Sequence, residues 1–254
     1  MSGDDLKLFL YTIIGFIIGL VLFFKGFKWM KQKQMIENIP TSKIRSLAMG
    51  LVEIKGKVIS QAGKVLKSPF SQSDCVYYKY TIEEYRRSGK HSRWVTIDKG
   101  EKGDYFYLKD DTGSVLVYPI GAEVNISLDN EFGSGFGRAP NSAITSFINE
   151  NKLLRLSFGN PQRRYKEYFI APNDELYILG TADDNPFVDE ATAKMGVEDV
   201  MIKKGNNESF FYISDKPENK LLSSLRWKTF GGLFGGLILL LVCLFFIFAF
   251  LRLV

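Results

Sequence analysis

The residues that most often bind metal ions or form disulfides are almost missing from this chain. Its 254 residues contain two cysteines and one histidine. Because Cys243 lies in a long apolar run near the carboxyl end, Cys75 has no disulfide partner in the rest of the chain. The composition therefore excludes a secreted, disulfide-rich domain and leaves a Cys/His zinc site short of ligands. We expect no metal site and no bound cofactor.

Residue patterns of a nucleophilic enzyme are also scarce. Cys75 begins an apolar segment, which is typical of a buried thiol rather than a nucleophile. Asp110 and Asp111 could pair as acid and base or bind a cation, but they precede Thr-Gly, which favours a turn. His91 lies among arginines and lysines, as in an exposed hairpin tip. We therefore assign no catalytic residue.

Charge is absent from two long segments, and this absence determines their solvent. Residues 8–24 form an uncharged run of 17 residues, and residues 230–251 form one of 22. At about 1.5 Å per residue, the first approaches the shortest helix that crosses a ~30 Å bilayer core. A cleaved signal peptide is the alternative for the first run, but no small-residue cleavage site follows it. We predict transmembrane helices at 8–24 and 230–251, on either side of one domain at 26–229.

Basic residues indicate the orientation of these two helices. They flank each apolar run on the side of the central domain, at Lys25, Lys28, Lys31, Lys33, Lys216, Lys220, Arg226 and Lys228. The positive-inside rule then places residues 26–229 in the cytoplasm. Anionic lipid favours this charge, so the formal net charge of +5 does not require nucleic acid as a partner. We expect an integral protein of the cell membrane.

The central segment has the period-2 pattern of strands over most of its length. Strands are predicted at 51–59 (with a glycine bend), 75–85, 93–99, 104–109, 114–118, 123–128, 164–170, 175–181 and 210–214. Short helices are predicted at 43–49 and 143–153, and an irregular segment at 183–207 with a helix near 190–194. We predict a mainly β (α+β) domain, arranged as a barrel or a sandwich.

Two further patterns in this segment have both a functional and a structural interpretation. Gly133, Gly135 and Gly137 are a weak match to a phosphate-binding loop, but the Lys-Ser ending is missing, so residues 129–140 are interpreted as a mobile loop. Tyrosines alternate along one strand, at Tyr77, Tyr78, Tyr80 and Tyr85. They could stack nucleic-acid bases, but a core face and a partly wet face explain them better.

Three blocks of the central domain follow one another in a recognisable order. The first comprises residues 66–71 and 74–80, the second 106–113, 117–119 and 121–123, and the third 167–168, 172–174 and 176–180. Together they resemble the GIDE domain, also called the beside-a-membrane domain, of the MULAN/MAPL family. The resemblance implies a domain between two membrane spans. The short prokaryotic members are the most similar, which implies a prokaryotic cell membrane.

The eukaryotic members of that family are E3 ubiquitin ligases that carry a RING finger after the second span. Here three residues follow the second predicted span, and two cysteines with one histidine cannot build the zinc sites of a RING. We therefore expect a non-enzymatic, membrane-anchored interaction or scaffolding module that binds a partner protein or lipid headgroups. The alternatives are a ubiquitin transferase, which the residue counts disfavour, and an unrecognised membrane-bound hydrolase.

Glycines spaced four apart in both apolar runs are candidate helix-packing residues. They are Gly15 with Gly19, Gly231 with Gly235, and Gly232 with Gly236. Residues four apart share a helix face, and glycine allows two helices to approach closely in lipid. The alternative is that glycine is simply frequent in membrane helices. Because the pairs lie at different depths, a homodimer through these faces is ranked slightly above a seam within one chain.

Overall fold

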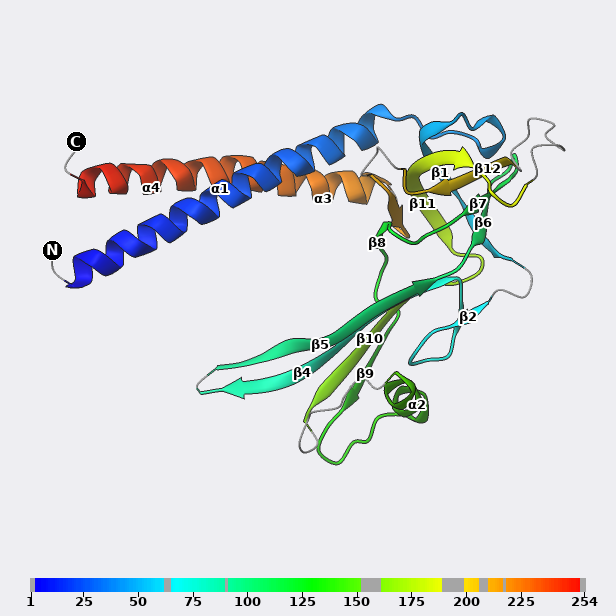
Figure 1. Cartoon of the computed structure of the whole chain (residues 1–254), viewed down its shortest axis with the longest axis horizontal. Helices are drawn as coiled ribbons and strands as arrows, with labels where there is room; N and C mark the ends of the chain where they lie inside the picture. The colour runs from blue at the N-terminus through cyan, green and yellow to red at the C-terminus, as the bar shows by residue number, and fades with distance from the viewer. Residues whose placement is uncertain are drawn as a thin grey trace. The chain divides into compact units, whose positions relative to one another are not determined.

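The computed structural model describes residues 3–61, 65–89, 91–151, 161–188, 199–205, 210–216 and 218–251. The chain divides into two compact units (Figure 1). One unit comprises Met1–Pro40 with Pro217–Val254, and the other is Thr41–Lys216. The first is helical and the second is mainly built of strands, so the fold class is α+β.

The helical unit is a hairpin of two long, apolar helices. The first is α1 (Gly3–Asn38), and the second consists of α3 (Glu218–Phe230), the π-helical turn η4 (Gly231–Gly235) and α4 (Gly236–Phe250). Leu6–Asn38 and Leu222–Phe250 are long and apolar enough to cross a membrane, with mean hydropathies of 2.4 and 3.0. Most of their large apolar side chains are exposed, as expected for contact with lipid. The chain thus has two candidate transmembrane helices.

Five strands of the second unit close into a barrel. They are β1 (Gly50–Ser60), β6 (Phe106–Lys109), β7 (Ser114–Val117), β12 (Val200–Lys203) and β11 (Glu175–Asp184), and β11 pairs back onto β1. All neighbours are antiparallel except β7 and β12. If the five strands are numbered by their order in the chain, their order around the barrel is first, second, third, fifth, fourth. The third and fifth strands are parallel. This is the connectivity of an OB-type Greek-key barrel, so the barrel prediction is confirmed over the sandwich.

The barrel closes because β1 pairs with two strands in succession. Residues 50–57 pair with β11, and residues 57–60 pair with β6. Gly56 lies at the point of change, where a Cβ would come within 2.5 Å of the Lys109 carbonyl oxygen. Only glycine allows this approach, which explains the glycine bend predicted for this strand.

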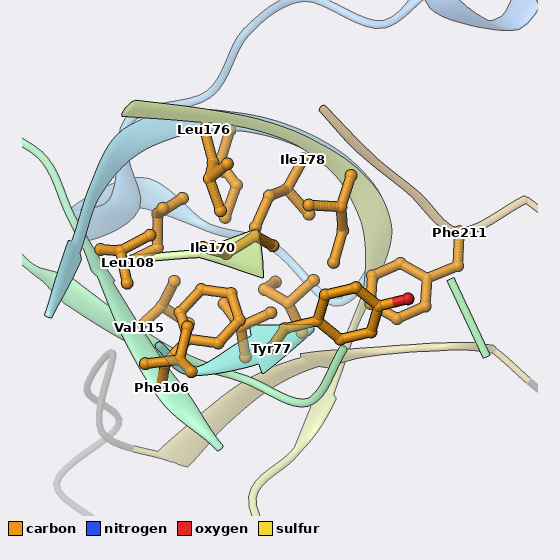
Figure 2. Close-up of a cluster of buried hydrophobic side chains, with 14 of the residues drawn as sticks. Tyr77, Phe106, Leu108, Val115, Ile170, Leu176, Ile178 and Phe211 are labelled. Carbon is orange, nitrogen blue, oxygen red and sulfur yellow. The ribbon is translucent and has the colours of Figure 1, made fainter. Parts of the chain in front are cut away.

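Apolar side chains fill the barrel (Figure 2). Ile54, Phe106, Leu108 and Ile178 come from three different strands and are fully buried. Two short strands, β8 (Glu123–Asn125) and β13 (Tyr212–Ser214), extend the sheet beyond β11. The turn η1 (Ile44–Ser46) adds Ile44 to the same core.

A second sheet and a helix are inserted into the barrel sequence. The sheet has the order β5 (His91–Gly103), β4 (Tyr77–Ser88), β10 (Arg163–Ile170) and β9 (Asn130–Ser134). The helix α2 (Ser142–Glu150) is capped by the Asn141 side chain, which accepts a hydrogen bond from the Ile144 backbone N–H at 2.7 Å. Its Ile144 joins a second core with Phe70, Ile82 and Tyr165. The short pair β2 (Leu66–Lys67) and β3 (Asp74–Cys75) lies in the segment before this sheet.

Three local predictions are wrong or incomplete. Residues 129–140 are not a mobile loop, because they contain β9 and a closed turn and Phe132 packs on the second core. The segment 183–207 contains β12, whose apolar run is only three residues long and lies next to Asp-rich sequence. The predicted helix at 43–49 is only the single turn η1. The helix predicted near 190–194, and the end of the one at 143–153, lie outside the described residues.

The barrel core offers a matched test of these assignments. Ile54 is fully buried and Ile59, on the same strand, is 39% exposed. Ile54→Ala should lower the free energy of unfolding by about 2–5 kcal/mol, whereas Ile59→Ala should lower it by less than about 1 kcal/mol. Urea unfolding of the detergent-solubilised chain, followed by tryptophan fluorescence, measures both. Equal losses for the two variants would contradict the assignment of β1 to the barrel wall.

Candidate functional site

Cys75 is a buried thiol. Its side chain is fully buried, and its Sγ lies 3.6 Å from the carbonyl oxygen of Leu66. Burial, together with the negative charges of Glu167 and Asp74, raises the pKa of the thiol to about 12. At neutral pH the group therefore stays protonated, whereas a cysteine nucleophile requires the thiolate.

The Asp110–Asp111 pair forms the predicted turn between β6 and β7. Asp110 accepts hydrogen bonds from the backbone N–H groups of Ile44, Thr112 and Gly113. Burial opposes ionisation of Asp110, but these hydrogen bonds outweigh it and hold its pKa below the ordinary value. Asp111 is exposed and pairs with Lys43 at 2.6 Å. Asp110 thus joins the turn to η1, and both of its oxygens accept hydrogen bonds from the protein itself.

Two buried carboxylates were missed at the sequence level. Glu167 is fully buried and accepts hydrogen bonds from the backbone N–H groups of Phe70 and Ser71 and from the Asn130 side chain. Glu53 is 1% exposed and accepts a hydrogen bond from the Tyr177 hydroxyl at 2.8 Å. The available signal was the strand period, which places Glu167 on the same inward face as Tyr165. Each of these carboxylates accepts hydrogen bonds from a neighbouring segment of the same domain, which indicates a structural role.

The alternating tyrosines of β4 do not form a row of free rings. Tyr77 belongs to the barrel core, and Tyr80 packs edge-on against Phe70 and Phe147 in the second core. Tyr78 is partly buried. Tyr85, which is 40% exposed, packs against Trp94 with ring centroids 5.2 Å apart. This arrangement favours the core interpretation over a platform that stacks bases.

Four of the six predicted glycines line a seam between α1 and the second long helix. A Cβ at Gly15 would come within 2.9 Å of the Cys243 Sγ. A Cβ at Gly236 would come within 2.8 Å of the Phe23 backbone nitrogen and 3.0 Å of the Gly19 carbonyl oxygen. The fourth of these glycines, Gly232, faces a position that sequence reasoning missed.

That position is Gly26, which lies two helical turns after Gly19 and so shares its face. A Cβ at Gly232 would come within 2.9 Å of the Gly26 Cα. A Cβ at Gly231 or Gly235 would meet no atom within 4 Å, so these two glycines point away from the seam. The structure thus forms the seam within one chain, and self-association of two chains stays a prediction.

A groove of about 680 Å³ lies at the polar end of the helical unit. It is lined by Lys33, Glu37, Leu222, Ser223, Arg226, Trp227 and Phe230. Trp227 is 73% exposed, and Lys33 pairs with Glu37 at 2.8 Å. Basic side chains beside an exposed indole ring are typical of the headgroup level of a bilayer.

Exposed arginines gather at one end of the four-stranded sheet. Arg86 and Arg87 lie just before the end of β4, and Arg93 faces Arg86 across the β4–β5 hairpin. His91, at the tip of the same hairpin, is exposed as predicted. Arg138 follows β9 in a turn that extends from the same end, because β4 and β9 both run antiparallel to β10. We call Arg86, Arg87, Arg93, Arg138 and the turn residue Phe136 the basic sheet end.

The acidic residues beside the basic sheet end are already paired. Glu84 is bound by Arg86 at 3.0 Å and by Arg163 at 3.1 Å. Glu83 pairs with Arg164 and with Lys166. Burial would raise the pKa of Glu83, but these two cations outweigh it and keep the pKa below its ordinary value. The basic sheet end therefore presents a net positive surface.

The described residues contain no cluster of three or more histidine, cysteine, aspartate or glutamate side chains able to hold a metal ion. Their titratable groups instead lie in turns, ion pairs and strand-to-strand hydrogen bonds. Among the described residues, the groove of the helical unit and the basic sheet end are two features that face outward.

Gly235 and Gly236 offer a matched test of the helix seam. Leucine at 236 has no room beside Phe23 and Gly19, whereas leucine at 235 points into open space. The rings of Phe9 and Phe250 lie 5.4 Å apart at the other end of the hairpin, so cysteines at these two positions report on its closure. Gly236→Leu should reduce this intrachain disulfide several-fold in membranes, and Gly235→Leu should leave it unchanged. Equal yields from both variants would contradict the seam.

One family model matches the chain. This is GIDE, described as "E3 Ubiquitin ligase", and the match covers residues 77–247, more than half of the chain. It extends from the first residue of β4 into α4 and thus includes most of the barrel and the second candidate span. Comparisons with curated proteins and with solved structures give no significant match. The resemblance to the GIDE domain is therefore confirmed, and the chain belongs to the GIDE family.

Proposed function

We propose that this chain is a membrane-anchored, non-enzymatic interaction module. Its GIDE domain faces the cytoplasm and binds a partner protein or lipid headgroups. The observation that carries this proposal is the basic sheet end, where four arginines and Phe136 are exposed. The buried carboxylates Glu167 and Glu53, in contrast, accept hydrogen bonds from other parts of the same domain.

The description of the family names a second function, that of an E3 ubiquitin ligase. A RING-type ligase requires eight cysteine or histidine ligands for two zinc ions. These 254 residues contain two cysteines and one histidine, and both cysteines are buried. Ubiquitin transfer by a RING is therefore disfavoured for this chain, as is nucleophilic hydrolysis by Cys75.

The cytoplasmic orientation rests on the basic flanks of the two candidate spans. It predicts that a cysteine at the exposed position 114 does not react with an impermeant maleimide in intact cells but reacts after the cells are opened. Native Cys75 stays unreactive in both cases, because it is buried and protonated. Ser134→Cys is the matched control, because Ser134 is 5% exposed. Labelling of Ser114→Cys in intact cells would contradict the cytoplasmic orientation and indicate the opposite one.

Photo-crosslinking tests the binding function itself. A photoreactive phenylalanine analogue at position 136 should form a reproducible adduct with a protein or a lipid in native membranes. The same analogue at Tyr107, a partly buried ring on the barrel strand β6, is the control and should form none. If position 136 forms no adduct above the level of the control, the basic sheet end is not a binding surface and the proposal fails.

A further inference from the structure

Two positively charged residues face each other near the hairpin tip of the basic sheet end. Arg86 and Arg93 are directly opposite partners in the β4–β5 ladder. Like charges in this position destabilise a pair of strands. Glu84 neutralises Arg86, but within the described part of the chain Arg87, Arg93 and Arg138 form no ion pair. Three guanidinium groups are thus available to an anionic partner.

Phe136 is held outward by a closed turn. The backbone N–H of Gly135 donates to the Arg138 carbonyl at 2.9 Å, and the N–H of Arg138 donates back to the Gly135 carbonyl at 3.0 Å. Gly137 supplies the positive φ of 72° that such a two-residue turn requires. Phe136 is 102% exposed, so no other described residue covers its side chain. The fold therefore presents an apolar ring beside positive charge.

The strand register places these groups at one edge of the domain. Ser134, Arg163 and Glu84 form one row across β9, β10 and β4. Beyond this row, β4 continues to Arg86 and Arg87, and β9 continues into the turn at Phe136. Neighbouring strands lie about 4.8 Å apart, so about 10 Å separates β4 from β9 across the sheet. A single flat surface can therefore reach both the arginines and the ring.

We propose that the basic sheet end docks on an anionic bilayer surface, with its arginines on lipid headgroups and Phe136 in the interfacial layer. This rests on the proposed function and narrows its partner to anionic lipid. The chain carries two candidate membrane spans, so a bilayer is present at high effective concentration around the tethered domain. Exposed basic and aromatic side chains together are the features that bind an anionic bilayer at its surface.

The aromatic rings favour a bilayer over single-stranded nucleic acid. Binding of single strands relies on several rings with free faces for successive bases. At the basic sheet end, Trp94 is packed against Tyr85 and covered by the Arg164 guanidinium, 4.4 Å from its centroid. Among the described residues of this surface, Phe136 is then the one fully exposed ring. One ring can enter a lipid interface, but it cannot form a stacking platform.

The test uses the full chain in lipid nanodiscs, with an environment-sensitive NBD fluorophore on Phe136→Cys in a Cys243→Ala background. Native Cys75 is buried and does not compete for the label. With phosphatidylserine in the disc, NBD emission should shift to the blue and become several-fold less accessible to iodide than with phosphatidylcholine alone. Salt at 1 M should reverse the shift, because it shortens the Debye length to about 3 Å.

Two triple variants with the same loss of charge distinguish docking through this particular surface from attraction by the net charge of the domain. Replacing Arg87, Arg93 and Arg138 with Gln should weaken docking roughly a hundredfold, since each basic group near an anionic surface contributes about fivefold. Replacing three exposed lysines elsewhere in the domain, Lys57, Lys102 and Lys109, should change it little. Equal loss in both variants would show that net charge alone attracts the domain and would overturn the assignment.

The remaining outcomes distinguish this inference from the proposed function. An unshifted NBD spectrum on anionic discs overturns the lipid inference. If position 136 still crosslinks to a protein in native membranes, the interaction function stands with a protein partner. An NBD response to added single-stranded RNA but not to anionic lipid would overturn the inference in favour of nucleic acid. Absence of both an NBD response and an adduct removes the basic sheet end as a binding surface.

Discussion

The closure of the barrel depends on one strand that pairs with two partners. β1 leaves β11 and joins β6 at residue 57, and the absence of a side chain at Gly56 makes this possible. Without this bend the sheet would keep two open edges, and the apolar residues of β6 and β11 would face water. The core around Ile54 and Ile178 is therefore a consequence of the backbone path as much as of hydrophobicity.

The barrel and the inserted sheet differ in what they expose. The interior of the barrel holds a cluster of buried apolar side chains (Figure 2). The inserted sheet, in contrast, ends in exposed residues at the β4–β5 hairpin and at the turn after β9. The carboxylates Glu83 and Glu84 form ion pairs with neighbouring cations there, so they are not available to the remaining arginines. The proposed binding surface therefore lies on the inserted sheet, outside the barrel core.

The helical unit follows different physics, because lipid gives no hydrophobic advantage to helix association. The two helices instead associate through close packing of small residues, at Gly19, Gly26, Gly232 and Gly236. The π-helical turn begins at the first glycine pair of the second helix. Extra backbone freedom at glycine is consistent with this local change of helix geometry.

The sequence by itself determined the two apolar helices, the mainly β domain and the family, because each depends on local patterns. Hydropathy marks a span, period 2 marks a strand, and the three blocks carried the resemblance to GIDE. Tertiary structure alone decided barrel over sandwich, since closure depends on which distant strands pair, such as β7 with β12. It also showed β9 and the Gly135–Arg138 turn in a segment whose glycines had indicated a mobile loop. The basic sheet end could not be predicted for the same reason: Arg93 and Arg138 are placed at the same end of the sheet only through the register of its four strands.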